Sequence, residues 1–181
     1  MLEDRRLLWW LKRGDRDALR LIYERYEGDL LTLAGNLLRD PGTAQDVVQD
    51  VFLGLVRSAP RLRLRRTLRA YLATAVANRA RDHYRRQARE QFVPLDDAGP
   101  IPAGSDGPAQ MVIRSDEMQR LRAAVEELPY EQREVLMLRV HAGLKFREIA
   151  KHQGVSLKTA ISRCQYGLDK LRSMLNGEVS K

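Results

Sequence analysis

The sequence AQDVVQDVFLGLV at residues 44–56, followed by LRAYLATAVANRARDHYRRQAR at residues 68–89, decides the fold of this chain. Both stretches repeat apolar residues at the spacing of an amphipathic α-helix. The first stretch is acidic, whereas the second is strongly basic. Between residues 57 and 90, eleven arginines stand against Asp82 and Glu90, which gives a local net charge of +9. So dense a positive charge predicts a polyanionic partner.

The composition limits the class of protein. The 181 residues suffice for one ordinary domain or two small ones. The net charge of +8 favours nucleic acid or an anionic membrane surface as a partner. No apolar run is long enough to span a bilayer, the N-terminus has no signal-peptide pattern, and the single cysteine, Cys164, excludes an internal disulfide framework. We therefore expect a soluble cytoplasmic protein without membrane insertion.

Helical spacing extends to the N-terminal side of the acidic stretch. Apolar residues recur from Leu7 to Leu38, and a new helix is predicted to begin at residues 15–17. We expect at least one of Trp9 and Trp10 to lie in the core, although the pair could instead form a partner-binding patch. Residues 40–42, Asp-Pro-Gly, are predicted to end this helical region, and Thr43 is the predicted cap of the next helix.

The helix predicted for residues 44–56 has two contrasting faces. Its apolar stripe consists of Val47, Val48, Val51, Phe52, Leu55 and Val56. Its opposite face consists of Asp46, Gln49, Asp50 and Leu53. From these residues alone, the second face is either a solvated surface or a docking surface for a basic partner, and the solvated surface is favoured.

The basic helix follows a loop at residues 61–67. Its predicted inward residues are Leu68, Tyr71, Leu72, Ala75, Val76, Ala80 and Tyr84. Arg81, Arg85 and Arg89 are spaced to form a single ridge on the surface. Because the guanidinium group matches phosphate oxygens bidentately, we predict that this ridge contacts phosphates; the alternative is a merely solubilising surface.

A predicted linker separates two modules. Residues 94–108 contain four of the seven prolines and three glycines, without apolar periodicity. We predict a first helical domain at residues 1–91, a flexible linker at residues 92–112 and a second helical domain at residues 113–178. The fold class is therefore all-α.

The second module contains a predicted helix-turn-helix. A short helix around Phe146 is followed by Gly154 and by a longer helix capped by Ser156. The polar face of the longer helix consists of Lys158, Thr159, Ser162, Arg163 and Tyr166. Hydrogen-bonding side chains on one face are typical of a helix that enters the major groove of DNA, although an ordinary helical hairpin could share this pattern.

No catalytic constellation is evident in the sequence. It lacks paired carboxylates at metal spacing, a glycine-rich phosphate loop and a nucleophile–base pair. We therefore predict that the chain is not an enzyme and binds no metal or cofactor.

Three segments carry a family resemblance: DPGTAQDVVQDVFLGLVR at residues 40–57, the basic helix at residues 68–89, and LPYEQREVLMLRVHAGLKFREIAKHQGVSLKTAISRCQYGLDKLR at residues 128–172. Over residues 15–90 and 117–175 the chain resembles bacterial sigma factors of the extracytoplasmic-function (ECF) group. The resemblance implies that the first module binds the clamp of core RNA polymerase and opens the minus-ten promoter element. It also implies that the second module reads the minus-thirty-five element.

The resemblance assigns expected roles to individual residues, so the docking interpretation of the acidic helix now prevails. The implied polymerase-binding residues are Asp46, Gln49, Asp50 and Leu53. The implied minus-ten residues, which hold a flipped base and backbone phosphates, are Arg61, Leu62, Arg63, Arg65, Arg66, Asn78, Arg79, Arg85 and Arg86. The implied minus-thirty-five residues are Arg147, Ser156, Lys158, Thr159, Ser162, Arg163 and Tyr166.

The chain also departs from the family pattern. Leu62 and Tyr71 stand where an aromatic residue and a tryptophan are usual, so we expect weaker stacking on a flipped base. Ile161 and Tyr166 also differ from the usual recognition helix, so the promoter sequence is expected to differ from that of relatives. Expected partners are core RNA polymerase, double-stranded and melted promoter DNA, and an anti-sigma factor. The alternative function is a stand-alone helix-turn-helix transcription regulator that does not engage polymerase.

Overall fold

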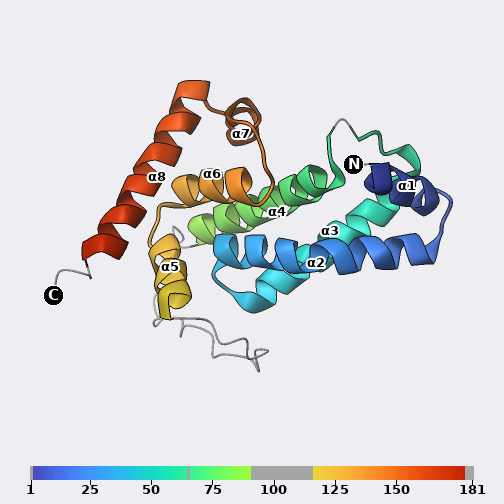
Figure 1. Cartoon of the computed structure of the whole chain (residues 1–181), viewed down its shortest axis with the longest axis horizontal. Coiled ribbons are helices and arrows are strands. Elements are labelled where there is room, and N and C mark those ends of the chain that lie inside the picture. The colour runs from blue at the N-terminus through green and yellow to red at the C-terminus, as the bar shows by residue number, and fades with distance from the viewer. Residues whose placement is uncertain (1, 65, 91–115, 178–181) are drawn as a thin grey trace.

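The computed structural model in Figure 1 describes residues 2–64, 66–90 and 116–177. Within these ranges the chain is helical and contains no strand, which confirms the all-α prediction. The first module comprises α1 (Leu2–Leu11), α2 (Arg16–Leu38), α3 (Pro41–Ser58), the short 3-10 helix η1 (Ala59–Arg61) and α4 (Leu68–Glu90). The second module comprises α5 (Asp116–Glu126), α6 (Tyr130–Val140), α7 (Phe146–Gln153) and α8 (Leu157–Gly177). The predicted linker at residues 92–112 lies outside the described residues.

The core of the first module lies between α2, α3 and α4. The long helix α2 packs against both of the others, and α1 covers its N-terminal half (Figure 1). Ile22, Leu33, Leu55 and Leu72 are fully buried at the contacts between these helices. Complete burial of one such side chain contributes about 1.5–3 kcal/mol to stability. The apolar stripes found in the sequence are therefore the faces that hold these helices together.

Acidic side chains define the starts of α2 and α3. Asp15 caps α2 by accepting a hydrogen bond from the Ala18 backbone N–H at 3.0 Å. Asp40 caps α3 by accepting a hydrogen bond from the Thr43 backbone N–H at 2.7 Å. The prediction that Thr43 caps α3 is wrong, because Pro41 fits the first turn of a helix and the helix therefore starts earlier. Hydrogen bonds from the Thr43 side chain and backbone hold the pKa of Asp40 below its usual range.

The second module is built around α6, with α7 and α8 forming the predicted helix-turn-helix. Gly154 ends α7 with φ of +68°, a left-handed conformation that glycine adopts without strain. The Ser156 hydroxyl accepts a hydrogen bond from the Thr159 backbone N–H at 3.0 Å, as expected for the cap of α8. Ala150 and Ala160, which are both buried, are small enough to keep these helices close. α8 runs along the outer edge of the module (Figure 1).

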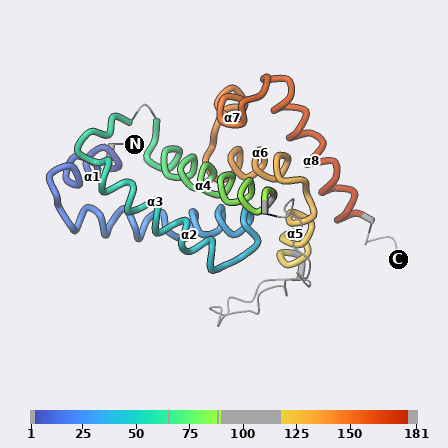
Figure 2. The backbone as a smooth tube through the Cα atoms, turned by 180° about the vertical axis from the view of Figure 1, so that it is seen from behind, coloured from blue at the N-terminus to red at the C-terminus, as the bar shows by residue number. Residues whose placement is uncertain are grey.

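The two modules lie against each other. α2 and α4 of the first module contact α6 of the second, and α2 also contacts α5 (Figures 1 and 2). Arg133, only 3% exposed, donates a hydrogen bond across this interface to the Leu37 carbonyl in the last turn of α2. Arg39, at the end of α2, donates to the Glu126 carbonyl of α5. The buried residues of both modules therefore form one continuous cluster.

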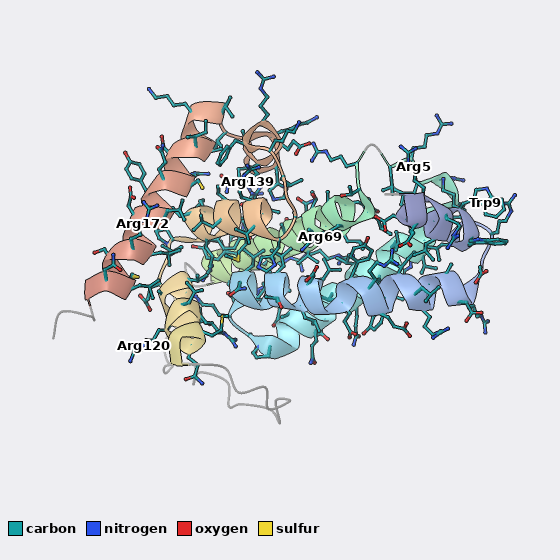
Figure 3. All side chains as sticks on the ribbon, viewed as in Figure 1. Arg5, Trp9, Arg69, Arg120, Arg139 and Arg172 are labelled. Carbon is teal, nitrogen blue, oxygen red and sulfur yellow. The ribbon has the colours of Figure 1, made fainter. Side chains whose placement is uncertain are left out.

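The tryptophan pair is not part of the core. Trp9 and Trp10 are 48% and 44% exposed, so the expectation that at least one is buried is wrong. α1 buries Leu7, Leu8 and Leu11 instead, because these three positions share the face that meets α2. Trp9 lies at the outer end of α1 in Figure 3, where the Arg13 guanidinium covers its ring at 3.3 Å from the centroid.

None of the helices in the described ranges is long and apolar enough to cross a membrane.

Candidate polymerase and DNA interfaces

The exposed face of α3 carries the residues predicted to bind polymerase. Asp46, Gln49, Asp50 and Leu53 fall at i, i+3, i+4 and i+7, so one side of the helix presents all four. All four are exposed, and Leu53 is 54% exposed despite its apolar side chain. An exposed leucine between acidic and amide side chains is suited to a protein partner with a mixed apolar and polar surface.

An apolar groove of about 430 Å³ lies beside this face, between α2 and α3. Its lining consists of Arg16, Leu19, Arg20, Tyr23, Gln49, Phe52, Leu53 and Val56. Val56 was predicted to face the core but is 41% exposed, because its position three residues after Leu53 turns it toward the groove. The α2 residues of this groove were missed by the sequence analysis, although the unusually broad apolar face of α3 was a signal that part of it lacks a neighbour.

The α3 face predicted to bind polymerase is joined to the basic helix α4 by an ion pair. The Asp50 carboxylate lies 2.6 Å from the Arg79 guanidinium, with the two side chains 55% and 45% exposed. Asp50 was predicted to contact polymerase and Arg79 to contact DNA phosphate, and nothing in the sequence indicated that the two side chains meet. The two predicted surfaces therefore meet at this pair.

The predicted minus-ten residues form a mainly exposed basic surface. Those with exposed side chains are Arg61, Arg63, Arg66, Asn78, Arg79, Arg85 and Arg86. Leu62 is half-buried and packs against the core, so its side chain is only partly available to a base. The Arg66 guanidinium lies 2.9 Å from the Glu148 carboxylate of α7. Arg65 lies outside the described residues.

The predicted arginine ridge on α4 is only partly present. Arg85 and Arg89 are exposed, but the Arg81 side chain is 15% exposed and extends into the second module. There it donates hydrogen bonds to the Glu134 carboxylate and, at 2.5 Å, to the His152 carbonyl. Tyr84, predicted to point inward, is 43% exposed and stacks on Tyr130 with ring centroids 4.4 Å apart. Both predictions fail because the two side chains face α6 of the second module, Arg81 toward Glu134 and Tyr84 toward Tyr130.

Glu134 is the most deeply buried charged residue in the described ranges, with no exposed surface. Burial alone would raise the pKa of the Glu134 carboxyl, but the hydrogen bonds from His152 and Arg81 outweigh burial and hold the pKa below its usual range. Glu134 was not among the residues predicted from the sequence. One feature of the sequence pointed to its burial: Arg133 and Glu134 are adjacent charged residues in a helix whose other residues are mainly apolar. Charged side chains are buried in a protein only when they have partners, so such partners were to be expected.

The predicted DNA-reading helix α8 presents its polar side chains at its N-terminal half. Lys158, Thr159 and Tyr166 are exposed, whereas Ser162 and Arg163 are half-buried. Arg163 donates a hydrogen bond to the Gln153 side-chain oxygen at 2.8 Å, which links α8 to the end of α7. The remaining predicted residues, Arg147 and Ser156, are exposed on α7 and at the cap of α8. Helix α8 thus places several donors near one helix end, an arrangement compatible with entry into a major groove.

No group of histidine, cysteine or acidic residues within the described ranges is arranged to hold a metal ion.

Two family models match the chain in the order of its modules. Sigma-70 region 2 matches residues 22–90, and Sigma-70, region 4 matches residues 118–171. The chain is 34% identical over 146 residues to the ECF RNA polymerase sigma factor SigD of Mycobacterium tuberculosis (strain ATCC 25618 / H37Rv), a match that covers 78% of this chain and 69% of that protein. It is 29% identical over 172 residues to the ECF RNA polymerase sigma factor SigK of Mycobacterium ulcerans (strain Agy99), with 94% and 92% covered.

Two solved structures share the fold. CnrH, solved in complex with the cytosolic domain of CnrY, superimposes with a TM-score of 0.65 at 24% identity and covers 96% of this chain and 97% of CnrH. The sigma factor RpoE of Bartonella quintana, solved with the anti-sigma factor NepR, superimposes with a TM-score of 0.67 at 23% identity and covers 90% of this chain and 98% of that one. Because both sigma-70 regions match in order and a curated relative is similar over most of its length, the chain belongs to the ECF group of the sigma-70 family of RNA polymerase sigma factors.

Proposed function

We propose that the chain binds core RNA polymerase through α3 and directs transcription from promoters whose minus-ten and minus-thirty-five elements it recognises. The single observation that carries this proposal is the exposed α3 face of Asp46, Gln49, Asp50 and Leu53 beside an apolar groove. A regulator that bound only DNA would have no use for such a face. The chain supplies binding energy and specificity, and the chemistry of transcription belongs to the polymerase.

The first module is proposed to recognise and melt the minus-ten element. The exposed arginines of the η1–α4 loop and of α4 supply guanidinium groups for the displaced strand, whose phosphates they match. Asn78, exposed beside Arg79, is the proposed side chain for hydrogen bonds to an unstacked base. Unstacking a base costs a few kcal/mol, which these contacts offset. Leu62 packs against the core and so holds the loop in position.

The second module is proposed to read the minus-thirty-five element with α8. Lys158 and Thr159 lie in the first turn, where a recognition helix contacts base edges. Arg163 and Ser162 follow one turn later, and Tyr166 lies another turn along. Arg147, exposed on α7, is proposed to contact the DNA backbone, a contact that positions the helix without reading sequence.

An anti-sigma factor is a further proposed partner. Both solved structures that share the fold are complexes, one of CnrH with the cytosolic domain of CnrY and one of RpoE with the anti-sigma factor NepR. The groove between α2 and α3 is a candidate surface for it, since its apolar floor is open to a partner.

The proposal is tested by capture of core RNA polymerase with the purified full chain, followed by run-off transcription from the chain's own upstream region. Co-elution with the polymerase and promoter-dependent transcripts are expected. Retained DNA affinity without polymerase binding would overturn the proposal and favour a stand-alone helix-turn-helix regulator.

A further inference from the structure

An exposed aromatic pair on α1 belongs neither to the core nor to the surfaces described above. Trp9 and Trp10 are 48% and 44% exposed, and their rings meet nearly at right angles, with centroids 4.7 Å apart. Both lie outside residues 22–90, the range that matches Sigma-70 region 2. Neighbouring exposed tryptophans, on a helix that already buries three leucines against α2, indicate a surface for a partner.

α1 is held firmly on α2, so the orientation of the pair is fixed. The Arg25 guanidinium of α2 lies 3.0 Å from the Glu3 carboxylate and 3.3 Å from that of Asp4. The Tyr26 hydroxyl donates a hydrogen bond to Asp4 at 2.8 Å. Burial and this hydrogen bond raise the pKa of Tyr26 to about 12, so the phenol keeps its proton at neutral pH. The two acidic side chains of α1 are therefore paired with α2.

The surface around the tryptophans is basic. From residue 5 to residue 13 the sequence holds four cations and no acid, and all four cations are exposed: Arg5, Arg6, Lys12 and Arg13. We call Trp9, Trp10 and these four cations the tryptophan surface. The Arg13 guanidinium covers one face of Trp9, and the edge-on contact between the rings uses the face of only one of them. These two contacts therefore leave at least one face of Trp10 for another flat group.

An unpaired nucleic-acid base fits this surface. Indole rings stack on bases, and cations beside the rings bind the adjacent phosphates, which is the combination that holds single strands. A duplex fits less well, because its bases are stacked on one another. An anionic membrane also fits less well, because a helix that lies in a membrane needs a broad apolar face and α1 turns its leucines to the core.

The tryptophan surface lies next to the loop proposed to hold the displaced strand. Figures 1 and 2 show η1, at the start of that loop, beside α1, and Figure 3 shows Trp9 and Arg5 at the same end of the molecule. In the loop, Leu62 is half-buried and offers no ring for stacking. Tyr84 of α4 is exposed but already stacks on Tyr130. In the described part of the first module, the tryptophan pair is thus the exposed aromatic surface that remains for a base.

We propose that Trp9 and Trp10 stack on an unpaired base of the displaced promoter strand, beside the bases held by the loop at residues 61–67. The surrounding cations bind the phosphates next to that base. This inference rests on the proposed function, because it gives the minus-ten surface the stacking ring that Leu62 does not provide. The tryptophan surface therefore stabilises the melted strand and contributes little to the binding of duplex DNA.

Intrinsic fluorescence tests the proposal, because Trp9 and Trp10 are the only tryptophans in the chain. The emission of the full chain therefore reports on this surface alone. A stacked base quenches indole emission, so titration with single-stranded oligothymidylate is expected to give saturable quenching. The duplex of oligothymidylate with oligoadenylate is expected to quench much less at the same concentration.

The affinity of variants is measured with a fluorescently labelled oligothymidylate. Trp10→Ala is expected to weaken single-strand binding by about five- to 150-fold, the range for the loss of one stacked base. Trp10→Tyr keeps an aromatic ring and should restore most of the affinity. Leu21→Ala, at a residue of α2 with the same exposure of 44%, is the matched control and should bind as the parent chain does. All three variants should retain the affinity of the parent chain for duplex DNA.

Three results would overturn the proposal. The first is a lack of quenching by the single strand. The second is an equal loss of single-strand and duplex affinity in Trp10→Ala, which would show that the ring does not act by stacking. The third is a blue shift of the emission on vesicles of phosphatidylglycerol without quenching by DNA, which would assign the tryptophan surface to an anionic membrane.

Capture of core RNA polymerase separates this inference from the proposed function. Trp10→Ala is expected to bind polymerase as tightly as the parent chain does. If Trp10→Ala loses single-strand affinity but the parent chain binds no polymerase, stacking by the pair is supported and the proposed function is overturned. If the parent chain binds polymerase and starts transcription while Trp10→Ala keeps its full single-strand affinity, the proposed function stands and the stacking role is overturned.

Discussion

The Asp50 carboxylate of α3 and the Arg79 guanidinium of α4 lie 2.6 Å apart and join the two surfaces assigned to polymerase and to promoter DNA. Both side chains are about half exposed, and an ion pair of this kind contributes at most about 1 kcal/mol to stability. Asp50 or Arg79 can therefore leave the ion pair and contact another molecule at little cost in free energy. Because Asp50 neutralises Arg79, a cation on polymerase that binds Asp50 also makes Arg79 more available to phosphate.

Charge reversal on α3 is expected to weaken polymerase binding and spare the fold. Asp46→Arg and Asp50→Arg should each lower the affinity for core polymerase at least tenfold, equivalent to about 1.4 kcal/mol. Their free energy of unfolding should change by less than about 1 kcal/mol, since both side chains are exposed. Titration of fluorescent polymerase and urea unfolding measure the two quantities.

Glu131→Arg is the matched control for these variants, because it makes the same charge change at an exposed position of α6. It should retain the affinity of the parent chain for polymerase. If all three variants bound polymerase equally well, the α3 face would not be the docking surface.

Two leucines of α3, two residues apart, are expected to respond in opposite ways. Leu53 is 54% exposed at the groove, so Leu53→Ala should change stability by less than about 0.5 kcal/mol while weakening polymerase binding. Leu55 is fully buried, so Leu55→Ala should destabilise the chain by about 2–5 kcal/mol. Thermal and urea unfolding, combined with polymerase capture at a temperature where both variants are folded, check this contrast. Normal capture by Leu53→Ala would remove the groove from the docking surface.

Replacement of polar residues on α8 is expected to reduce promoter recognition. Lys158→Ala and Arg163→Ala should each cost about 1–3 kcal/mol of affinity for duplex promoter DNA if the side chain reads a base. Lys170→Ala, at an exposed lysine three turns further along α8, is the control and should have little effect. The measurement compares promoter with random DNA at one salt concentration. An equal loss on both would reassign the residue to phosphate contact.

The sequence predicted the parts of the fold that depend on local chemistry. The helical spacing of apolar residues predicted α2, α3 and α4. Gly154 and Ser156 predicted the turn and the cap of the helix-turn-helix. Each of these features depends on side chains within a few residues of one another. The cap of α3 was misplaced by three residues, because both Asp40 and Thr43 have suitable side chains and only the backbone path distinguishes them.

The sequence could not predict which exposed faces a second module would cover. Arg81 and Tyr84 lie on the basic helix, and periodicity places them relative to α4 alone. Their partners Glu134 and Tyr130 are some fifty residues away, beyond the reach of any periodic pattern. The same limit applies to the groove beside Val56, since its walls come from two helices. The polymerase and DNA roles of individual residues remain predictions.

The buried carboxylate of Glu134 is expected to make the stability of the chain sensitive to acid. Burial would raise the pKa of Glu134, but hydrogen bonds from His152 and Arg81 hold it below its ordinary value of about 4.3. A lowered folded-state pKa means that the carboxylate contributes its full stabilisation above about pH 4.3 and loses it as the pH falls through the folded-state value. The groups that face the carboxylate are Arg81 from α4, His152 and Gln153 from α7, and Tyr130 from α6.

Glu134→Gln isolates this contribution, because the amide keeps the size of the side chain and cannot be ionised. At pH 7 the variant should be less stable than the parent chain by about 3–5 kcal/mol, since Arg81 loses its anionic partner inside the protein. Below about pH 4.3 the difference should shrink as the parent carboxylate becomes protonated. Urea unfolding of both chains between pH 3 and pH 7 measures how the free energy of unfolding of each chain depends on pH. If the free energies of unfolding of the two chains changed in parallel over this range, the protonation of Glu134 would not be coupled to folding. Other carboxylates would then set the acid sensitivity of the chain.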